Sequence, residues 1–357
     1  MKRAPVQQHH RTALDGLFRY ADLLHFGEVH VKFDPVTGLK AIIAIHNLKR
    51  GSAIGGCRLI HYPTTDGALE DALRLAYMMS FKAAISNLPH GGAKAVLIKP
   101  KEIKDRKAYF EVFGDFINEL GGRYVTAMDS GTNAEDMDVI ETRTPYVTCT
   151  SISKNSGDPS PQTALGVRRS IEAAVKFKTG RASLEGIHVA IQGAGHVGYF
   201  LAKELYQCGA QLTVCDVNEM ALQRCIDEFG AESCSPDTIY DVSADVFSPC
   251  ALGAVLNLQN IKRLKVSIVA GSANNQLAHH HHGALLLERD ILYAPDFVAN
   301  AGGLIYVAAV YDHAELTRAK AQVEGIYDTL MDIFIQAKRD NCPTNDIAEK
   351  IAAERLS

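Results

Sequence analysis

Residues 187–198 read IHVAIQGAGHVG, an apolar run followed by three glycines in the spacing G-x-G-x-x-G. The run predicts a strand and residues 196–208 predict a helix, so the glycines occupy a strand-to-helix turn. In such a turn Gly193 permits the tight bend, Gly195 lets the backbone approach a pyrophosphate, and Gly198 lets helix and strand pack closely. The amides and positive potential of the helix N-terminus would then bind the phosphates of a dinucleotide.

An acidic residue completes this fingerprint. Asp216 ends the next predicted strand, QLTVC, where its carboxylate can accept hydrogen bonds from both hydroxyls of a ribose. The same charge would repel a 2′-phosphate, so the sequence favours NAD over NADP. A glycine turn without a ligand is the plainer alternative, and Asp216 at this distance argues against it. The predicted cofactor-binding residues are Gly193, Ala194, Gly195, His196, Val197, Gly198 and Asp216, with His196 near the phosphates but without chemistry of its own.

Strands and helices alternate around the fingerprint. Further helices are predicted at 164–178 and 219–229, and strand-like runs at 245–248, 265–270 and 291–298. This alternation predicts βαβ units and a parallel sheet. The stretch KNSGDPSPQT, residues 154–163, is rich in turn formers and predicts a linker, and the last 40 or so residues predict helices with a break at NCPTND.

The first 150 residues predict a mixed unit. HVKF and LKAIIAIHN flank DPVTG, which predicts a hairpin. Asp66 is expected to cap a helix with the 3.6-residue apolar period, on which Lys82 falls at the border of the apolar stripe. Pro89 and a Gly91–Gly92 turn are expected to follow before Lys94 begins a strand. After a second helix at 107–120, the strand RYVTAM runs into Asp129, at the strand end where catalytic side chains commonly emerge.

These patterns together predict an α/β protein of two domains. The first is an N-terminal α/β catalytic domain, residues 1–150. The second is a Rossmann-type doubly wound dinucleotide-binding domain, residues 151–318. The C-terminal helices, residues 319–357, are expected to pack back on the first domain.

Composition narrows the class of protein. With 22% charged and 47% hydrophobic residues and a formal net charge of -4, the chain gives no sign of nucleic-acid or membrane partners. The start lacks the apolar segment of a signal peptide, and GGLIYVAAVY (302–311) is better read as a buried helix than a membrane span. Eight scattered cysteines without C-x-x-C are expected to be reduced thiols. We therefore expect a cytoplasmic protein.

Residues 80–96, SFKAAISNLPHGGAKAV, hold two lysines in unusual surroundings. Lysines ordinarily lie on solvated surface, and that is the plain reading of Lys82 and Lys94. Apolar neighbours and glycines argue for a pocket, in which one ammonium could pair with the carboxylate of an amino or keto acid. The second lysine could exchange protons near neutrality, and Asp129 could serve as the other acid or base.

Several long motifs carry a resemblance to the glutamate, leucine, valine and phenylalanine dehydrogenase superfamily, most of all to its leucine dehydrogenase branch. They span nearly the whole chain: IGGCR (54–58), EDALRLAYMMSFKAA (70–84), HGGAK (90–94), GRYVTAMDSGT (122–132), GDPSPQTALGV (157–167), IQGAGHVG (191–198), DVFSPCALGAVLN (245–257), IVAGSANNQL (268–277) and YAPDFVANAGGLI (293–305).

The resemblance implies a role for each matching residue. Lys82 would bind the substrate carboxylate, Lys94 would be the catalytic lysine that activates water, and Asp129 would be the catalytic aspartate that exchanges protons with the amino group. The site would lie in a cleft between two domains whose closure excludes water. Further implied positions are Gly55, Gly56, Met79 and Asn300 around the substrate, and Thr163 and Asn274 at the nicotinamide end.

The same resemblance implies the substrate class. Glutamate dehydrogenases hold the side-chain carboxylate with a further lysine, where this chain has Ile54, so an apolar substrate is expected. Ala127, Leu304 and Val307 would complete the pocket for leucine, isoleucine or valine. An aromatic substrate, phenylalanine or tryptophan, stays open, because one or two methylenes change discrimination by only about 1–3 kcal/mol. A catalytically silent NAD-binding protein is the other alternative.

Some features depart from the family or resist assignment. Ala93 stands where GGGK is usual, and Tyr306 and Ala309 replace an asparagine and an acid beside the pocket, which bears on the choice of substrate. The resemblance implies that the N-terminal domain also serves oligomerisation, and because the C-terminal tail is short, a homo-oligomer is expected without a fixed size. The run His279–His282 is expected to be a polar exposed turn, and Cys250 a small buried residue. His90 has no assigned role.

Overall fold

The computed structural model describes residues 26–151 and 158–356, which form two compact units. Among these residues, unit 1 comprises 26–48, 52–79 and 92–146, and unit 2 comprises 49–51, 80–91 and the residues from 147 onward. Helix α2 (Thr65–Ile85) and strand β4 (Gly91–Ile98) each contribute residues to both units. The chain is therefore an α/β protein of two domains, and the predicted domain boundaries at 150 and 318 stay predictions.

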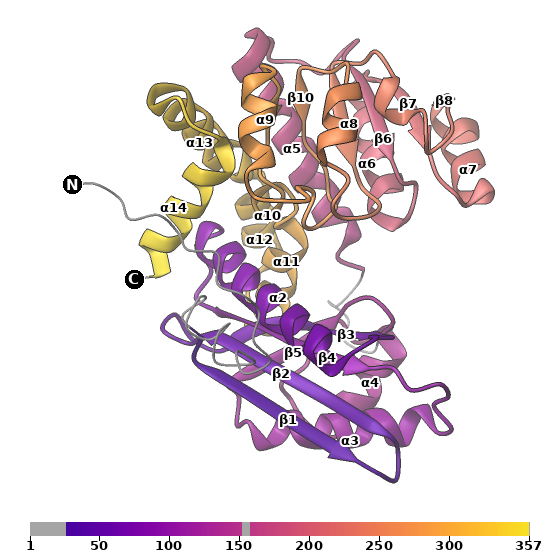
Figure 1. Ribbon diagram of the computed structural model, residues 1–357, viewed down its shortest axis with the longest axis vertical. Helices are drawn as coiled ribbons and strands as arrows, with labels where there is room; N and C mark the ends of the chain where they lie inside the picture. Colours follow the sequence, from indigo (N-terminus) through magenta and orange to yellow (C-terminus); the bar gives the residue numbers. More distant parts are fainter. Residues whose placement is uncertain (1–25, 152–157, 357) are drawn as a thin grey trace, which may run out of the picture. The chain divides into compact units, whose positions relative to one another are not determined.

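Unit 1 is built on a five-stranded sheet in the order β1-β2-β4-β3-β5 (Figure 1). Its strands besides β4 are β1 (Glu28–Asp34), β2 (Leu39–Asn47), β3 (Ala53–Ile60) and β5 (Tyr124–Met128). The predicted hairpin is confirmed: β1 and β2 pair antiparallel, and Asp34 accepts hydrogen bonds from the amide and hydroxyl of Thr37 in the turn between them. Strands β3 and β5 pair parallel, which brings the residues that follow both strands to the same edge.

Helices cover both faces of this sheet, α2 on one and α3 (Arg106–Glu119) on the other (Figure 1). Helix α4 (Ala134–Glu141) follows β5 and begins at Asn133 with a capping box. The apolar period of α2 has the predicted effect, because Ala72 and Ala76 pack with Ile42 and Val96 of the sheet. The predicted cap was wrong by two residues: Thr64 accepts the hydrogen bond from the Gly67 amide, and Asp66 lies inside the first turn.

Unit 2 is built on a six-stranded sheet in the order β11-β10-β9-β6-β7-β8, in which neighbouring strands pair parallel. This is the doubly wound dinucleotide-binding order, with the reversal of direction between β6 and β9. The strands are β6 (His188–Gln192), β7 (Gln211–Cys215), β8 (Glu232–Ser233), β9 (Val246–Pro249), β10 (Ile268–Val269) and β11 (Leu292–Tyr293). The accompanying helices are α5 (Ser160–Thr179), α6 (His196–Gln207), α7 (Glu219–Phe229), η1 (Ile239–Asp241), α8 (Leu258–Arg263) and α9 (His282–Glu288).

The remaining helices complete unit 2. They are α10 (Asp296–Ala299), α11 (Gly302–Tyr311), α12 (Leu316–Glu324), α13 (Ile326–Asp340) and α14 (Thr344–Leu356). Side chains of the C-terminal helices reach the end of α2, which belongs to unit 2, so their expected packing on the first domain stays a prediction. Gln322 of α12 donates to the Ser86 carbonyl, and Arg355 of α14 donates to the Ile85 carbonyl, at 2.7 and 2.6 Å.

Three local predictions were wrong. Gly91 and Gly92 are not a turn, because they are the first residues of β4, where Gly92 pairs with Asn47 of β2 and Lys94 lies inside the strand. The predicted linker at 154–163 lies partly outside the described residues, and its last residues, from Ser160, form the first turn of α5 with Pro159 before it. In the run 291–298 only Leu292 and Tyr293 form a strand, since Pro295 ends it and Asp296 starts α10.

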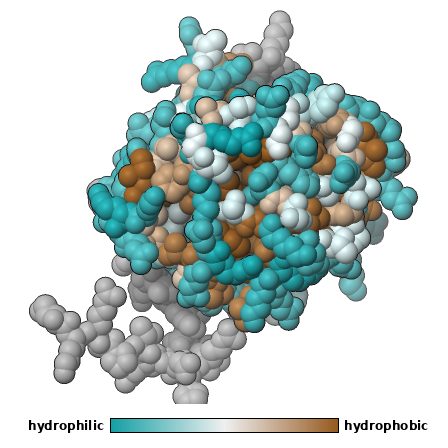
Figure 2. Space-filling view, turned by 90° about the horizontal axis from the view of Figure 1, so that it is seen from above, coloured by the Kyte–Doolittle hydropathy of each residue, from teal (hydrophilic) through white to brown (hydrophobic). Residues whose placement is uncertain are grey.

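The face of the molecule in Figure 2 carries small hydrophobic patches among hydrophilic side chains. No helix within the described ranges is long and apolar enough to cross a membrane. None of the eight cysteines, which all lie in those ranges, forms a disulfide bond, and Cys57, Cys149, Cys215 and Cys225 are buried.

Candidate functional site

Unit 1 brings Lys94 and Asp129 together as an ion pair. Lys94 lies in β4 and Asp129 directly follows β5, and the Lys94 ammonium donates to Asp129 Oδ2. Their side chains are only 8% and 16% exposed. A lysine and a carboxylate in such a place can pass a proton between them with little competition from water. The plain reading of Lys94 as a solvated surface charge does not hold.

Two glycines make this approach possible. A Cβ on Gly55 would stand 1.6 Å from the Ala93 carbonyl oxygen, so only glycine lets β4 approach β3 here. A Cβ on Gly56 would stand 2.9 Å from the Cβ of Asp129. Gly55 therefore admits the strand that carries Lys94, and Gly56 leaves room for the carboxylate that Lys94 binds.

The register places predicted pocket residues on the same face as Asp129. Gly56 pairs with Ala127, and side chains two residues apart in a strand share a face. Ile54 and Ala127 therefore lie on the Gly56 side of the sheet, and Asp129 continues that side beyond the strand end. Both Ile54 and Ala127 are buried. The candidate proton-exchanging pair thus borders an apolar surface.

The loop after β5 fixes the orientation of Asp129. The Thr132 hydroxyl accepts from the Asp129 amide and donates to the Cys57 carbonyl, while Asp129 Oδ1 accepts from the Ser130 amide. Burial raises the pKa of the Asp129 carboxyl, but the charges of Lys94 and Arg58 outweigh burial and hold that pKa well below its usual range. Asp129 is therefore ionised at neutral pH.

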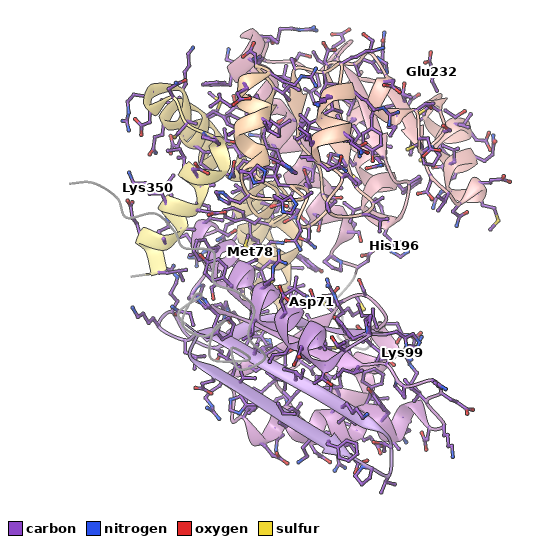
Figure 3. All side chains as sticks on the ribbon, viewed as in Figure 1. Asp71, Met78, Lys99, His196, Glu232 and Lys350 are labelled. Carbon is purple, nitrogen blue, oxygen red and sulfur yellow. The ribbon has the colours of Figure 1, made fainter. Side chains whose placement is uncertain are left out.

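Arg58 is a member of this group to which the sequence assigned no role. Its Nη1 donates to Asp71 of α2 at 2.9 Å, and Tyr62 donates to the same Asp71 oxygen at 2.5 Å. Asp71 projects from α2 in Figure 3. Arg58 Nε lies 3.7 Å from Asp129 Oδ2. Alternation along IGGCR could have indicated this placement, because Arg58 lies two residues beyond Gly56.

In unit 2 the glycine turn between β6 and α6 has the backbone geometry that the G-x-G-x-x-G spacing predicts. Gly193 has a φ of 103°, which favours glycine, and it follows β6 at the point where the strand order reverses. A Cβ on Gly195 would meet nothing within 4 Å, whereas one on Gly198 would stand 1.9 Å from the Gly193 carbonyl oxygen. The turn is thus open where a pyrophosphate would approach and closed where helix and strand pack. These residues fit a dinucleotide.

Asp216 closes the other side of this turn. Its carboxylate accepts from the Ala194 amide at 2.6 Å and from the Asn218 amide at 2.7 Å. His196 begins α6 and is largely exposed (Figure 3). Its Nδ1 lies 3.2 Å from Oδ2 of Asp158, and Val197 follows it in the first turn of the helix. The carboxylate therefore stands next to the fingerprint backbone, where a ribose would lie beside the phosphates.

A second group in unit 2 joins three of the predicted site residues. Asn274 Oδ1 accepts from Lys82 Nζ at 3.1 Å and from Asn300 Nδ2 at 2.8 Å. Asn300 also donates to the Ser272 carbonyl, and its own Oδ1 is buried without a hydrogen-bond partner. An unsatisfied buried acceptor is costly, so a donor from a ligand would stabilise this position.

The structure gives the position of each of the other predicted residues but does not bring them into one group. Thr163 lies in the first turn of α5, where its hydroxyl donates to the Pro159 carbonyl. Met79 is half-buried on α2. Leu304 and Val307 lie on α11 in unit 2, whereas Ile54 and Ala127 lie in unit 1. That these four line one pocket stays a prediction.

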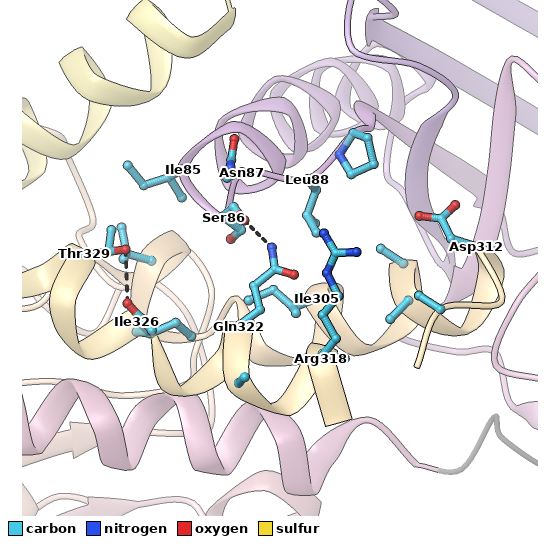
Figure 4. A pocket seen from close by; sticks show the side chains of 18 of the residues that line it. Ile85, Ser86, Asn87, Leu88, Ile305, Asp312, Arg318, Gln322, Ile326 and Thr329 are labelled. Atoms are coloured by element: carbon cyan, nitrogen blue, oxygen red, sulfur yellow. Dashed lines mark hydrogen bonds between the residues drawn. The ribbon is translucent and has the colours of Figure 1, made fainter. Parts of the chain in front are cut away.

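Unit 2 also contains a pocket of about 840 Å³ that holds none of the predicted site residues. The segment after α2 and helices α11, α12 and α13 line it, and Gln322 and Arg318 project into it (Figure 4). At its border His90 is buried and its Nε2 lies 2.9 Å from Asp312. His90 thus has a carboxylate partner at the point where β4 begins.

The histidine run and Cys250 have structural explanations. His279–His281 form a turn as expected, but His282 begins α9 and is buried, with Nδ1 2.9 Å from the Leu256 carbonyl oxygen. The expectation of an exposed tract was therefore wrong for His282. Cys250 is half-buried, and burial raises the pKa of its thiol, which makes the reactive thiolate less available.

Comparisons with known proteins match both units. The model of the Glu/Leu/Phe/Val dehydrogenase dimerisation domain matches residues 25–146, and that of the glutamate/leucine/phenylalanine/valine dehydrogenases matches residues 214–344. Leucine dehydrogenase of Thermoactinomyces intermedius is 47% identical, over 95% of this chain and 93% of that protein. Phenylalanine dehydrogenase of the same organism is 42% identical, over 90% and 89%. The crystal structure of L-tryptophan dehydrogenase from Nostoc punctiforme superposes with a TM-score of 0.83 at 38% identity, covering 95% of this chain and 98% of that one.

Proposed function

Because the chain belongs to the glutamate/leucine/phenylalanine/valine dehydrogenase family, and is an amino-acid dehydrogenase with a nicotinamide cofactor, we propose that it catalyses the reversible NAD-dependent oxidative deamination of an apolar L-amino acid. The proposed substrates are leucine, isoleucine and valine, and the products are the 2-oxo acid and ammonia. The observation that carries this proposal is the buried Lys94–Asp129 pair beside the apolar residues Ile54 and Ala127.

The pair supplies the proton transfers of this reaction. A nicotinamide cofactor, when bound, accepts hydride from the substrate Cα. Asp129 takes a proton from the ammonium group of the substrate, and loss of the Cα hydride then leaves a C=N double bond. Lys94, in its neutral form, takes a proton from water as the water oxygen adds to the imine carbon to give a carbinolamine. Asp129 returns its proton to nitrogen, ammonia leaves as the C–N bond breaks, and the hydroxyl proton passes to the freed Asp129 carboxylate as the 2-oxo group forms.

Lys82 is the proposed partner of the substrate carboxylate, and Gly55, Gly56 and Met79 are also proposed to bind the substrate. Asn274 and Thr163 are proposed for the nicotinamide end. The open atom of Asn300 is an acceptor, which suits a donor such as the cofactor carboxamide better than the substrate carboxylate. We therefore propose that Asn300 binds the cofactor carboxamide and not the substrate carboxylate.

NAD is proposed over NADP because of Asp216. A ribose with free hydroxyls can donate to this carboxylate, whereas a 2′-phosphate would bring a second negative charge against it. The open space at Gly195 supports phosphates at the start of α6.

An aromatic amino acid is the second candidate substrate. It is favoured by the likeness to the tryptophan dehydrogenase structure and by the 42% identity to phenylalanine dehydrogenase. Leucine is preferred because its dehydrogenase relative is more similar, at 47%.

We also propose a homo-oligomer. Strand β1 is an edge strand with Val31 and Phe33 exposed by 70% and 61%, and it lies in the segment that matches a dimerisation domain. Unpaired edge strands with apolar side chains are commonly covered by another chain.

The purified protein, tested with a panel of L-amino acids and both nicotinamide cofactors, decides the substrate. Formation of reduced cofactor is followed by absorbance, with the D-enantiomers as matched controls. We expect the highest kcat/KM for leucine, isoleucine or valine with NAD. Turnover of phenylalanine or tryptophan alone would replace the substrate proposal, and binding of NAD without any turnover would favour a silent protein.

A further inference from the structure

Arg58 sits between two carboxylates in unit 1. One edge of its guanidinium is tied to Asp71, which Tyr62 also binds. The other edge presents Nε to Asp129 at 3.7 Å, and this nitrogen is buried without a hydrogen-bond partner. A buried charged donor without an acceptor is unfavourable, so a nearby acceptor should become available to it at some stage.

The acceptor that Arg58 faces is the one that Lys94 occupies. In its ion pairs with Lys94 Nζ and with Arg58 Nε, Asp129 presents the same oxygen, Oδ2. While Lys94 is bound to that oxygen, Arg58 remains beyond hydrogen-bond distance. When Lys94 turns to another partner, the oxygen becomes free for Arg58 Nε.

The two cations differ in one property that matters for catalysis. A lysine can give up its proton and lose its charge, whereas an arginine in a protein stays charged. In the proposed reaction Lys94 changes its protonation, and without another cation Asp129 would then be a buried carboxylate with no counter-charge. Such a carboxylate takes up a proton and can no longer accept one from the substrate.

We propose that Arg58 is a positioning residue of the reaction, which keeps Asp129 ionised and oriented while Lys94 is neutral. The inference rests on the proposed function. Asp71 and Tyr62 hold the guanidinium in place from α2 and from the chain just beyond β3. Arg58 itself touches neither the substrate nor the cofactor in this role and acts through Asp129.

The other titratable groups near Asp129 do not replace this charge. Burial raises the pKa of the Cys57 thiol to about 12, and burial together with the Asp71 hydrogen bond raises the pKa of Tyr62, so both stay neutral. The Asp71 carboxylate binds Nη1 of Arg58, whereas Nε is the Arg58 nitrogen closest to Asp129. Lys94 and Arg58 are therefore the two cations that govern the carboxylate.

The first experiment compares Arg58→Met, Arg58→Lys and Arg143→Met. Arg143 is a matched control in unit 1, because its guanidinium also pairs with a carboxylate, Asp115, at 2.8 Å. We expect Arg58→Met to lower kcat by about 10²-fold and to move the acidic limb of the rate–pH profile upward by about one unit or more. KM for NAD should change by less than about 3-fold, since the fingerprint is in unit 2. Arg58→Lys should restore the limb, because it keeps a charge, and Arg143→Met should leave it in place.

The second experiment is independent of turnover. Aspartate labelled with ¹³C at the side-chain carboxyl reports protonation by NMR, and Asp129→Asn identifies the Asp129 signal. We expect Arg58→Met to raise the pH at which Asp129 takes up its proton by about 1–3 units, and Arg143→Met to leave it unchanged.

The outcomes separate the two proposals. If wild-type protein turns over no amino acid, the proposed function fails, and the carboxyl signal still decides whether Arg58 governs Asp129. If turnover is normal in Arg58→Met, or if the Asp129 signal does not move, the assignment of Arg58 is overturned. A loss of kcat that Arg58→Lys does not relieve, with an unmoved pH limb, would show a structural role only.

Discussion

At the scale of single residues, two opposite charges lie in a buried position, where their interaction is strong. Lys94 and Asp129 lie 35 residues apart in the sequence and form one ion pair with little exposure to solvent. Breaking such a pair leaves an uncompensated buried charge, which is why both members are informative targets for substitution.

Lys94→Met tests the proposed chemistry. It removes the amine that activates water and leaves the fingerprint of unit 2 unchanged. We expect kcat to fall by about 10²–10⁴-fold, with the dissociation constant for NAD unchanged within about 3-fold. Cofactor binding is measured by calorimetry and kcat by absorbance. Lys99→Met, an exposed lysine just beyond the same strand (Figure 3), is the control. Near-normal turnover in Lys94→Met would remove Lys94 from the mechanism.

Asp216→Asn tests cofactor choice. The substitution keeps the shape of the side chain and removes the charge that should bind ribose hydroxyls and repel a 2′-phosphate. We expect KM for NAD to rise about 10-fold or more, since hydrogen bonds to charged groups contribute about 1.5–3 kcal/mol, and the preference for NAD over NADP to shrink. Steady-state kinetics with both cofactors measure this. Asp227→Asn, exposed on α7, should change neither value.

At the scale of elements, the approach of strands decides which side chains meet. The β3–β5 register sets Ile54, Gly56 and Ala127 on one side of the sheet, and the glycines of β3 admit β4 and Asp129. In unit 2 the turn at Gly193 and the packing at Gly198 join β6 to α6. The packing of strands and helices thus sets the positions of the charged side chains.

Gly55→Ala tests this strand approach. The added Cβ would overlap the Ala93 carbonyl oxygen, so β4 must move. We expect the free energy of unfolding to fall by about 1–3 kcal/mol and kcat to fall as Lys94 shifts. Urea denaturation and kinetics measure the two effects. Gly27→Ala is the control, because its Cβ would meet backbone oxygens at 3.6 Å, an ordinary contact. A stable, active Gly55→Ala would contradict the packing role.

At the scale of the whole molecule, the chain passes several times between the two units. The end of α2, with Lys82, belongs to unit 2 with the C-terminal helices, whereas the beginning of α2 belongs to unit 1. Arg355 and Gln322 bind the carbonyls at this end of the helix. The position of Lys82 therefore depends on the last residues of the chain.

Assembly is tested at β1. We propose that Val31 and Phe33 lie in a contact between copies, so the double substitution Val31→Glu and Phe33→Glu should reduce the mass measured by light scattering. Buried like charges would oppose association. Lys101→Glu, at an exposed lysine of the same unit beyond β4, is a control for charge alone. A wild-type monomer, or an assembly unaffected by the double change, would contradict this contact.

Local patterns in the sequence were sufficient for much of the fold. The hairpin at β1–β2, the apolar period of α2, and the strand–turn–helix at Gly193 were predicted because turn chemistry and periodicity act between neighbouring residues. The family motifs pointed to the same two-domain class. Errors came where a longer-range contact overrode a local signal: Gly91 and Gly92 look like a turn, but they begin β4 and Gly92 pairs with β2. His282 looks exposed but is buried, with its ring next to the Leu256 carbonyl.

The sequence by itself determined the fold class, the dinucleotide turn and the identity of the candidate lysines and aspartate, since each follows from a short motif. Only the tertiary structure decided that Lys94 and Asp129 share a hydrogen bond, that Asn274 joins Lys82 to Asn300, and that Arg58 faces Asp129. These contacts join residues far apart in the chain. The contacts of Asp129 depend on strand register and on the close approach that Gly55 and Gly56 allow, neither of which a local pattern specifies.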